Sequence, residues 1–220
     1  MTIPRSRWPK LWIRIILLIC VFVVALIGQI AFRANKQRQA VAMCVDSGGY
    51  VIYEAEYDFK KHGFVSRKGL PKWFHLEEFR DYFTNVVKIS VSSDQFDKTL
   101  FKYLPKLDSL EFKDVKQNDL NFISGLTNLK ILHLTGKELE DLGALASLKN
   151  LKQIRLTDIS VANIEPLSKL INLKFVTIYD CKVDERQIEN LKIENPACEV
   201  IVFQVKTKIE NLLKHRSRKK

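Results

Sequence analysis

A spacing of 22 residues constrains this chain more than any other feature of its sequence. Leu107, Leu129, Leu151 and Leu173 are separated by 22 residues each, and each begins the pattern L-x-x-L-x-L with conservative changes. When these leucines are numbered offset 1, the first three blocks also carry mostly apolar residues at offsets 11, 14, 17 and 20. Over these seven offsets, 20 of 21 residues are apolar, with Gln117 as the exception, whereas chance would supply about ten. The chain therefore contains an internal repeat.

The apolar offsets have a direct structural meaning. Apolar residues at offsets 4 and 6 are typical of a short strand with one buried face, and the three-residue steps that follow are typical of a helical or 3₁₀ return segment. One such unit cannot bury its own apolar side, whereas stacked units share a continuous core. The sequence therefore predicts an α/β fold in which short parallel strands alternate with helical or 3₁₀ return segments in a solenoid.

This pattern resembles the leucine-rich repeat superfamily and, in its 22-residue period, the class that is also found in internalins. The resemblance covers about residues 86–203 and implies a leucine-rich repeat solenoid. The family usually places an Asn at offset 9, where its side chain bonds backbone groups in the turns. Here that position holds Val115, Lys137, Ile159 and Cys181, so an Asn ladder at this offset is not expected.

The segment before the repeats is interpreted as an N-terminal cap. VVKISV, with Val86, Ile89 and Val91, reads as a degenerate first strand that lies one residue out of phase. We expect a helix to end at the Gly48–Gly49 pair, and YVIYEAEYDF, residues 50–59, then predicts a strand. Apolar residues at helical spacing predict a capping helix closer to the repeats, and they are Trp73, Leu76, Phe79 and Phe83.

The segment after the fourth block is interpreted as a C-terminal cap. Arg186, Glu189 and Lys192 interrupt the phase of the repeat. The segment NPACEVIVF then restores a strand, with Cys198 and Val200 at the core-facing offsets 4 and 6. The residues that follow, 204–220, form a basic tail that is predicted to be disordered.

An apolar run near the N-terminus predicts a membrane anchor. Residues 11–32 are compatible with one helix, which would reach about 33 Å against a hydrocarbon thickness of about 30 Å. A cleaved signal peptide is the alternative, but its apolar region is typically about 7–15 residues and ends in a small-residue cleavage site. The sequence favours an uncleaved, single-pass transmembrane helix. A slight excess of Lys and Arg before the run favours the extracytoplasmic side for the main domain.

The formal charge of +11 is concentrated at the two ends of the chain. Residues 1–40 hold seven Lys or Arg and no acid, and residues 204–220 hold seven and one acid, which leaves −2 for residues 41–203. A domain that binds duplex nucleic acid usually has a basic face of its own. The distribution therefore argues against nucleic acid as a partner, except through the tail.

The N-terminal half adds a narrower resemblance. A basic start, an apolar run, the segment RANKQRQAVAMCVDSGGYVIYEAEYD and an aromatic-rich stretch before the repeats resemble small membrane-anchored leucine-rich repeat proteins of planctomycete bacteria. This resemblance implies an architecture and no reaction. It is consistent with five segments: basic start 1–10, transmembrane helix 11–32, juxtamembrane helix and cap 33–85, repeats with C-terminal cap 86–203, and tail 204–220.

The sequence contains no recognisable catalytic or metal-binding arrangement. The four histidines are dispersed, the four cysteines form no CxxC pair, and there is no phosphate-binding glycine loop or nucleophile elbow. Asp114, Asp158 and Asp180 recur at offset 8, but Gly136 interrupts the row, so a solvated edge is favoured over a cation site. We expect no enzyme activity, no cofactor and no bound metal ion.

The outward residues of the strands provide the candidate binding surface. If offsets 4 and 6 face the core, offsets 3, 5 and 7 face outwards. There, apolar, aromatic and basic residues that are typical of protein interfaces form the predicted protein-binding surface: Ile131, His133, Arg155, Phe175 and Tyr179. In the alternative interpretation, the apolar residues are ordinary surface residues, and Glu111, His133 and Arg155 form a surface charge network.

These observations predict a non-enzymatic, membrane-anchored leucine-rich repeat protein that binds a protein partner through the concave strand face. Two alternatives stay open. In one, the chain is a structural envelope protein that associates with copies of itself. In the other, it is an electrostatic adaptor whose C-terminal tail contacts anionic lipid or nucleic acid.

Overall fold

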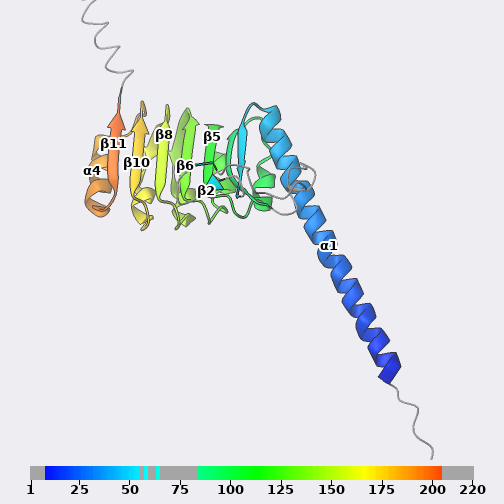
Figure 1. The fold of residues 1–220 in the computed structure, drawn as a ribbon. Coiled ribbons are helices and arrows are strands. Elements are labelled where there is room, and N and C mark those ends of the chain that lie inside the picture. The colour runs from blue at the N-terminus through cyan, green and yellow to red at the C-terminus, as the bar shows by residue number, and fades with distance from the viewer. Residues whose placement is uncertain (1–7, 55–56, 59–62, 65–83, 205–220) are drawn as a thin grey trace, which may run out of the picture.

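The computed structural model describes residues 8–54, 57–58, 63–64 and 84–204 (Figure 1). It begins with the long helix α1 (Trp8–Asp46), followed by strand β1 (Tyr50–Tyr53) and a short antiparallel pair, β2 (Tyr57–Asp58) and β3 (Gly63–Phe64). The strand predicted over residues 50–59 is therefore interrupted after Tyr53. The predicted capping helix with Trp73, Leu76, Phe79 and Phe83 lies outside the described residues, as do residues 205–220 of the tail.

A seven-stranded sheet forms the centre of the molecule, in the order β1-β4-β5-β6-β8-β10-β11. Strand β1 is antiparallel to its neighbour, and the remaining strands are parallel. Their bounds are β4 (Val86–Ser92), β5 (Ser109–Val115), β6 (Ile131–Gly136), β8 (Gln153–Thr157), β10 (Phe175–Tyr179) and β11 (Glu199–Phe203). From β5 to β10, equal offsets of successive repeats lie opposite each other, so Leu110 pairs with Leu132 and Leu132 with Ile154.

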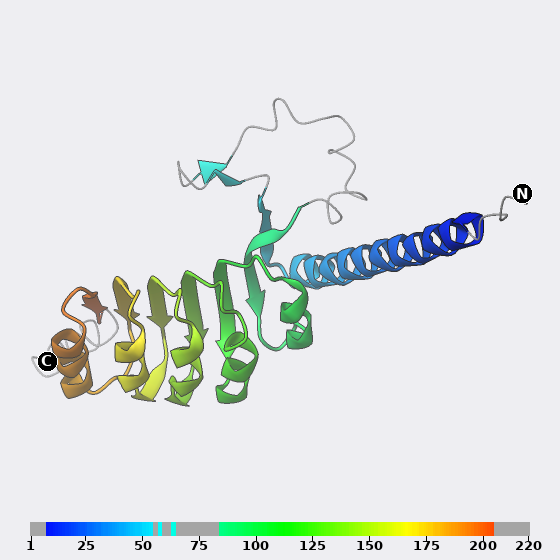
Figure 2. The same cartoon turned by 90° about the horizontal axis from the view of Figure 1, so that it is seen from below.

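Short helical segments return the chain from the end of each strand to the start of the next. They are η3 (Lys98–Tyr103), η4 (Gln117–Asp119) with α3 (Leu120–Ile123), η5 (Gly143–Ser147), η6 (Glu165–Lys169) and α4 (Glu185–Glu194). These segments lie on one face of the sheet and leave the other face open (Figure 2). The core lies between the sheet and the return segments. It contains the predicted residues at offsets 1, 4 and 6, each at most 2% exposed, so their inward direction is confirmed.

A second, two-stranded parallel sheet was not predicted. Strands β7 (Glu138–Asp141) and β9 (Ser160–Asn163) pair just after the ends of β6 and β8. Their buried residues, Leu139 and Val161, occupy offset 11. Strand β7 has no other apolar residue, and in β9 the other one, Ala162, directly follows Val161, so no alternation indicates a strand there.

Two glutamine side chains complete this small sheet at its edges. Gln117 Oε1 accepts from Glu140 N at 2.7 Å, and its Nε2 donates to Asp141 O at 3.1 Å. On the other edge, Gln187 Nε2 donates to Ala162 O at 2.7 Å, and its Oε1 accepts from Ile164 N at 2.8 Å. Each amide therefore supplies the donor and the acceptor of an adjacent strand. This is why the repeat carries Gln117 where its other blocks carry apolar residues.

Helix α1 is continuous over 39 residues. Its first part is apolar and exposed, and its last part packs against the sheet. An 18-residue window within it has a mean hydropathy of 3.0, with none of the window buried, so its length and composition make it a candidate membrane span or signal sequence. Towards its C-terminal end, buried residues recur on one face against β1, β4 and η3: Ala34, Gln37, Ala40 and Cys44. Gln37 Nε2 donates to Thr84 O at 2.9 Å. The same helix therefore forms part of the core at the N-terminal end of the sheet.

The predicted phase of the last strand is wrong by two residues. Val200 pairs with Val176, and Val202 with Ile178, so Val200 and Val202 occupy the positions expected for Cys198 and Val200. The last return segment is the ten-residue α-helix α4, whereas η5 and η6 have five residues each. Because an α-helix rises about 1.5 Å per residue and a 3₁₀-helix about 2.0 Å, more residues are needed to return to the start of the next strand.

Candidate protein-binding surface

The parallel register arranges the outward residues in rows across the open face of the sheet. Offset 3 gives one row, in which Ile131 pairs with Gln153 and Gln153 with Phe175. Neighbouring strands lie about 4.8 Å apart, so side chains in one row are in contact distance of their neighbours. Ile131, Phe175 and Tyr179 are exposed by 41%, 45% and 38%. The structure therefore places all three apolar candidates on the open face.

The part of this face on β5, β6 and β8 is polar and hydrogen-bonded. His133 Nε2 lies 3.0 Å from Thr157 Oγ1, and Arg155, the next residue in the row, is exposed. Burial lowers the pKa of His133 below its ordinary value, Glu111 opposes this shift, and Arg155 adds to it. The imidazole is therefore neutral near pH 7 and takes part in a hydrogen bond rather than an ion pair.

The alternative interpretation, a surface charge network of Glu111, His133 and Arg155, agrees with the structure only in part. Glu111 Oε2 accepts from Tyr50 Oη at 3.2 Å, and Glu111 Oε1 lies 3.6 Å from Lys113 Nζ. The ring of Tyr50 also lies 5.4 Å from Lys88 Nζ. Glu111 is thus held by β1 and by its own strand, while Arg155 acts on His133 as a neighbouring positive charge.

The apolar part of the open face lies on the last two strands. The rings of Tyr179 and Phe203 are 6.0 Å apart and tilted by 43°, and Ile201 pairs with Thr177 beside them. Phe203 is exposed by 46% and Ile201 by 37%. Together with Phe175, these residues form a patch that we call the β10–β11 patch: Phe175, Tyr179, Ile201 and Phe203.

The five predicted residues do not form one cluster. Ile131 on β6 is separated from Phe175 on β10 by Gln153 on β8, while His133 and Arg155 belong to the polar part of the face. The predicted surface did not include Ile201 and Phe203 because it covered only the outward offsets of the four repeat blocks. The two-residue shift of β11 does not change the face on which they lie. The unbroken apolar run VIVF, which lacks the alternation of the other strands, is the sequence signal that indicates them.

The aspartates at offset 8 have a conformational role. Asp114, Asp158 and Asp180 have φ values of 54°, 57° and 50°, in the left-handed region where Asp and Asn are enriched among residues other than glycine. Within the ranges that the structure describes, no group of three His, Cys, Asp or Glu residues is arranged to hold a metal ion. The recurrence of Asp is therefore explained by the turn that ends each strand.

An asparagine ladder stabilises the opposite edge of the sheet. At offset 22, Asn128 Nδ2 donates to Pro105 O at 2.7 Å, and Asn150 Nδ2 donates to Thr127 O at 2.9 Å. Asn172 repeats the bond to Lys149 O at 2.7 Å. The ladder expected of the repeat class at offset 9 is absent from that position. There, Val115, Ile159 and Cys181 are buried, and Lys137 is exposed.

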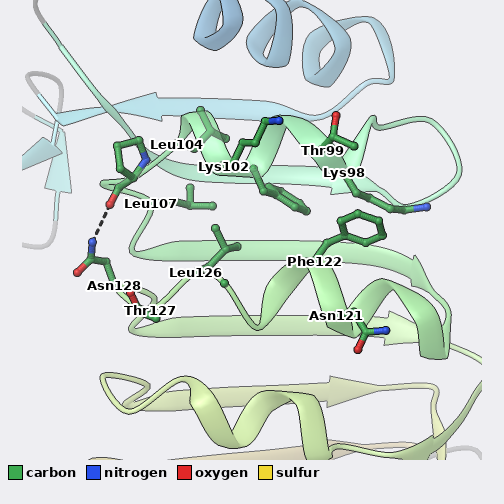
Figure 3. A pocket seen from close by; sticks show the side chains of 13 residues that line it. Lys98, Thr99, Lys102, Leu104, Leu107, Asn121, Phe122, Leu126, Thr127 and Asn128 are labelled. Atoms are coloured by element: carbon green, nitrogen blue, oxygen red, sulfur yellow. Dashed lines mark hydrogen bonds between the residues drawn. The ribbon is translucent and has the colours of Figure 1, made fainter. Parts of the chain in front are cut away.

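A pocket of about 570 Å³ lies between η3 and α3, on the side of the return segments (Figure 3). Its lining includes Phe101, Phe122 and Leu126 together with Lys98 and Lys102. None of the predicted surface residues lines it. Phe101 and Leu126 of its lining belong to the core, whereas Phe122 is exposed.

The buried thiols are unreactive in character. Burial raises the pKa of Cys44 to about 11. Burial also raises the pKa of Cys181 and of Cys198. Since the thiolate is the nucleophile, these three cysteines act as small apolar residues.

Comparison with known proteins gives a distant structural match. No family model matches the sequence, and no curated protein matches it. The chain is similar to the crystal structure of internalin C2 from Listeria monocytogenes, at 27% sequence identity and a TM-score of 0.37. The match covers 48% of this chain and 46% of internalin C2, so the chain spans about half of that protein's length. The narrower resemblance to planctomycete proteins has no support among these matches.

Proposed function

We propose that this chain is a non-enzymatic leucine-rich repeat protein, anchored by α1, that binds a protein partner through the open face of its sheet. The repeat class is supported by the 22-residue period, by the parallel register that aligns equal offsets, and by the complete burial of the apolar offsets. These three properties describe a solenoid in which each turn buries its apolar side against the next.

The membrane anchor is supported by the exposure of the apolar part of α1. Large apolar side chains from Trp12 to Phe32 are exposed on all sides of the helix, with Leu18 at 69% and Val24 at 68%. Leaving so much apolar surface in water is unfavourable, since burial is worth about 25 cal/mol per Å². An uncleaved span places the repeats beside a membrane, and the Lys and Arg excess before the span favours the extracytoplasmic side.

The β10–β11 patch is the observation that carries the binding proposal. It presents three aromatic rings and Ile201 on a rigid sheet, where water would otherwise cover them. Aromatic residues are enriched at interface centres, and surrounding polar residues form the rim. Arg155, opposite Thr177 on the neighbouring strand β8, provides part of such a rim here. A partner with an apolar projection that fits between Phe175 and Phe203 matches this surface.

The test is a photo-crosslinker at Thr177, at the centre of the patch, in the full chain within its native membrane. We expect a crosslinked product that is lost in the variant Phe175→Ala/Phe203→Ala while the melting temperature is retained. Truncating two such contacts typically weakens binding by about 2 kcal/mol or more. The matched control places the crosslinker at Ser168 on η6, which faces away from the open face.

Two results would contradict the proposal. The same product from Thr177 and Ser168 would mean that capture does not depend on the patch. A large drop in melting temperature for the double variant would mean that the aromatic rings stabilise the fold itself. Either result would mean that the open face is an ordinary exposed surface and not a binding site.

Self-association is a second candidate, favoured by the position of β11. This strand is the last of the seven in the sheet order, and all of its residues except the half-buried Val200 are exposed. A free strand edge with apolar residues is a template for pairing with another strand. If copies pair through β11, the sedimentation coefficient of the full chain in detergent should rise with concentration. The backbone N–H groups of residues 199, 201 and 203 face β10, so that of Val202 faces the outer edge, and Val202→Pro should abolish the rise because it removes this donor.

A further inference from the structure

The charged residues of the repeats are divided between the two edges of the sheet. The segments that precede strands contain six lysines and two acids, whereas the segments that follow strands, which include parts of β7 and β9, contain three lysines and seven acids. The first group comprises residues 104–108, 126–130, 148–152, 170–174 and 192–198, and the second comprises residues 92–96, 114–118, 136–140, 158–162 and 180–184. The small net charge of the folded region thus conceals a basic strand-start edge, of formal charge +4, and an acidic strand-end edge, of formal charge −4.

The lysines of the strand-start edge form a periodic, exposed set. Lys130, Lys152 and Lys174 occupy the same offset on neighbouring turns, so their backbones lie about 4.8 Å apart. Lys130 is paired with Asp108 at 3.2 Å. Lys106, Lys149 and Lys192 lie on the same edge, and all six lysines are exposed. An anionic surface would reduce the electrostatic repulsion among like charges at this spacing.

Two isoleucines project from the same edge. Ile171 is 81% exposed and Ile193 is 76% exposed, the highest values among the exposed large apolar side chains of the described residues. Ile171 lies in the turn before β10, and Ile193 lies at the C-terminal end of α4 in the turn before β11. Exposed apolar side chains flanked by lysines are typical of surfaces that lie in the headgroup region of a bilayer.

Helix α1 places this edge next to its apolar segment. The strands point away from the N-terminal end of α1, which extends beyond the strand-start edge (Figure 1). The ring of Phe32, the last residue of the predicted span, lies 5.9 Å from the ring of Tyr103 in edge-on contact. Tyr103 ends η3 and directly precedes residues 104–108, the first segment of the strand-start edge, which contains Lys106. The end of the apolar segment and the basic edge therefore lie at the same level.

We propose that the strand-start edge docks on the anionic lipid headgroups of the membrane that α1 spans, with Ile171 and Ile193 inserted at the interface. This inference rests on the proposed membrane anchorage and adds a second, electrostatic contact to it. Because α1 already holds the chain at the membrane, the edge can contact the lipid headgroups without a further loss of translational freedom. Each lysine near an anionic bilayer then contributes about 1 kcal/mol. Because transmembrane helices tilt by about 20° on average, the array has freedom to settle onto the bilayer.

The experiment uses the full chain in nanodiscs and an environment-sensitive nitrobenzoxadiazole probe at Ile171→Cys, in a Cys20→Ser background. The remaining thiols, Cys44, Cys181 and Cys198, are buried and resist labelling. In discs that contain phosphatidylglycerol we expect a blue-shifted, brighter probe than in discs of phosphatidylcholine alone. The matched control carries the probe at Lys137→Cys on the strand-end edge, where no lipid dependence is expected.

A variant that removes three of these positive charges tests the electrostatic part of the proposal. Lys149→Gln/Lys152→Gln/Lys174→Gln should lower the docked-to-undocked ratio at position 171 by tenfold or more, an order-of-magnitude value for three lysines. Lys116→Gln/Lys137→Gln/Lys182→Gln, with the same change in net charge on the opposite edge, should leave the ratio unchanged. About 1 M salt, with a Debye length of about 3 Å, should mimic the first variant.

The outcomes separate the docking from the anchor. A chain that alkaline carbonate extracts from the disc contradicts the anchor and, with it, this inference. An inserted chain whose probe at position 171 stays in water in both lipids contradicts the docking alone. Equal shielding in both lipids would exclude an electrostatic contact. Shielding in detergent that grows with protein concentration would assign the edge to a second copy of the chain, and would also overturn the proposal.

Discussion

Individual residues at equivalent positions of the repeat differ because their backbones differ. Asp158 directly follows β8 and has a φ of 57°, a conformation that costs an ordinary L-residue about 1–2 kcal/mol and glycine almost nothing. Gly136 holds the equivalent position at the end of β6, where an added Cβ would lie 2.7 Å from Val115 O. The first position holds a side chain at the cost of backbone strain, whereas the second excludes a side chain by contact.

The variants Asp158→Gly and Asp158→Ala test this difference. Both remove the carboxylate, so their difference isolates the backbone, and we expect Asp158→Gly to be more stable by about 1 kcal/mol. Urea unfolding of the two variants provides the measurement. The opposite order, with alanine more stable, would show that the left-handed turn is not maintained in solution.

His133 gives a prediction about pH. Burial lowers its pKa in the folded chain below the ordinary 6.5, so the unfolded chain binds the proton more readily than the folded one. Stability from this group is therefore complete above about pH 6.5 and decreases as the pH falls towards the folded-state pKa. An imidazole NMR titration should give a midpoint below 6.5. In His133→Gln, the corresponding part of the pH dependence of unfolding should disappear, and its persistence would assign that dependence to another group.

At the scale of elements, the repeat determines the strands more strongly than it determines the segments between them. Strands β5 to β10 follow from the alternation at offsets 4 and 6. Strand β11 was placed two residues early because the sequence does not distinguish a ten-residue α-helix from a short 3₁₀ return. The same limit applied to β7 and β9, since Leu139 and Val161 alone carry no period of two. The apolar centre of the candidate surface lies on β10 and β11 instead of β6, because Ile201 and Phe203 of β11 were not among the predicted residues.

Gln117 tests the role of the small sheet. Gln117→Leu restores the apolar pattern of the repeat, so sequence similarity alone predicts a gain in stability. The structure predicts a loss of about 1–3 kcal/mol, because Glu140 N and Asp141 O lose their partner. Thermal unfolding should therefore occur at a lower temperature. Gln153→Leu, on the open face, is the matched control and should change stability by no more than about 0.5 kcal/mol.

At the scale of the whole molecule, the array has a different element at each end. The C-terminal end finishes with α4 and the exposed strand β11, while the N-terminal end is covered by α1. In a repeat array, stability is approximately the sum of unit and interface contributions, so losing one covered end exposes the next unit. The contact between α1 and the sheet is therefore expected to affect the entire array.

Ala40 provides the test of this contact. Its side chain is fully buried, so Ala40→Arg introduces a charge without a partner and should destabilise the fold by about 3 kcal/mol or more. Hydrogen exchange should increase first in β1 and β4 and then in the repeats beyond them. Ala42→Arg, on the exposed side of the same helix, should have little effect. Equal effects of the two variants would mean that α1 does not pack on the sheet as described.

The continuity of α1 also has a directional consequence. The helix passes from its apolar segment into the core without a break, and it runs broadly along the strands (Figure 1). An anchored chain of this shape has no swivel between anchor and array, so the open face looks sideways over the membrane and not away from it. The chain would therefore meet a partner by lateral diffusion within the same bilayer. The open face would reach no further above the membrane surface than the length of one short strand, so the partner's binding region must lie within that height.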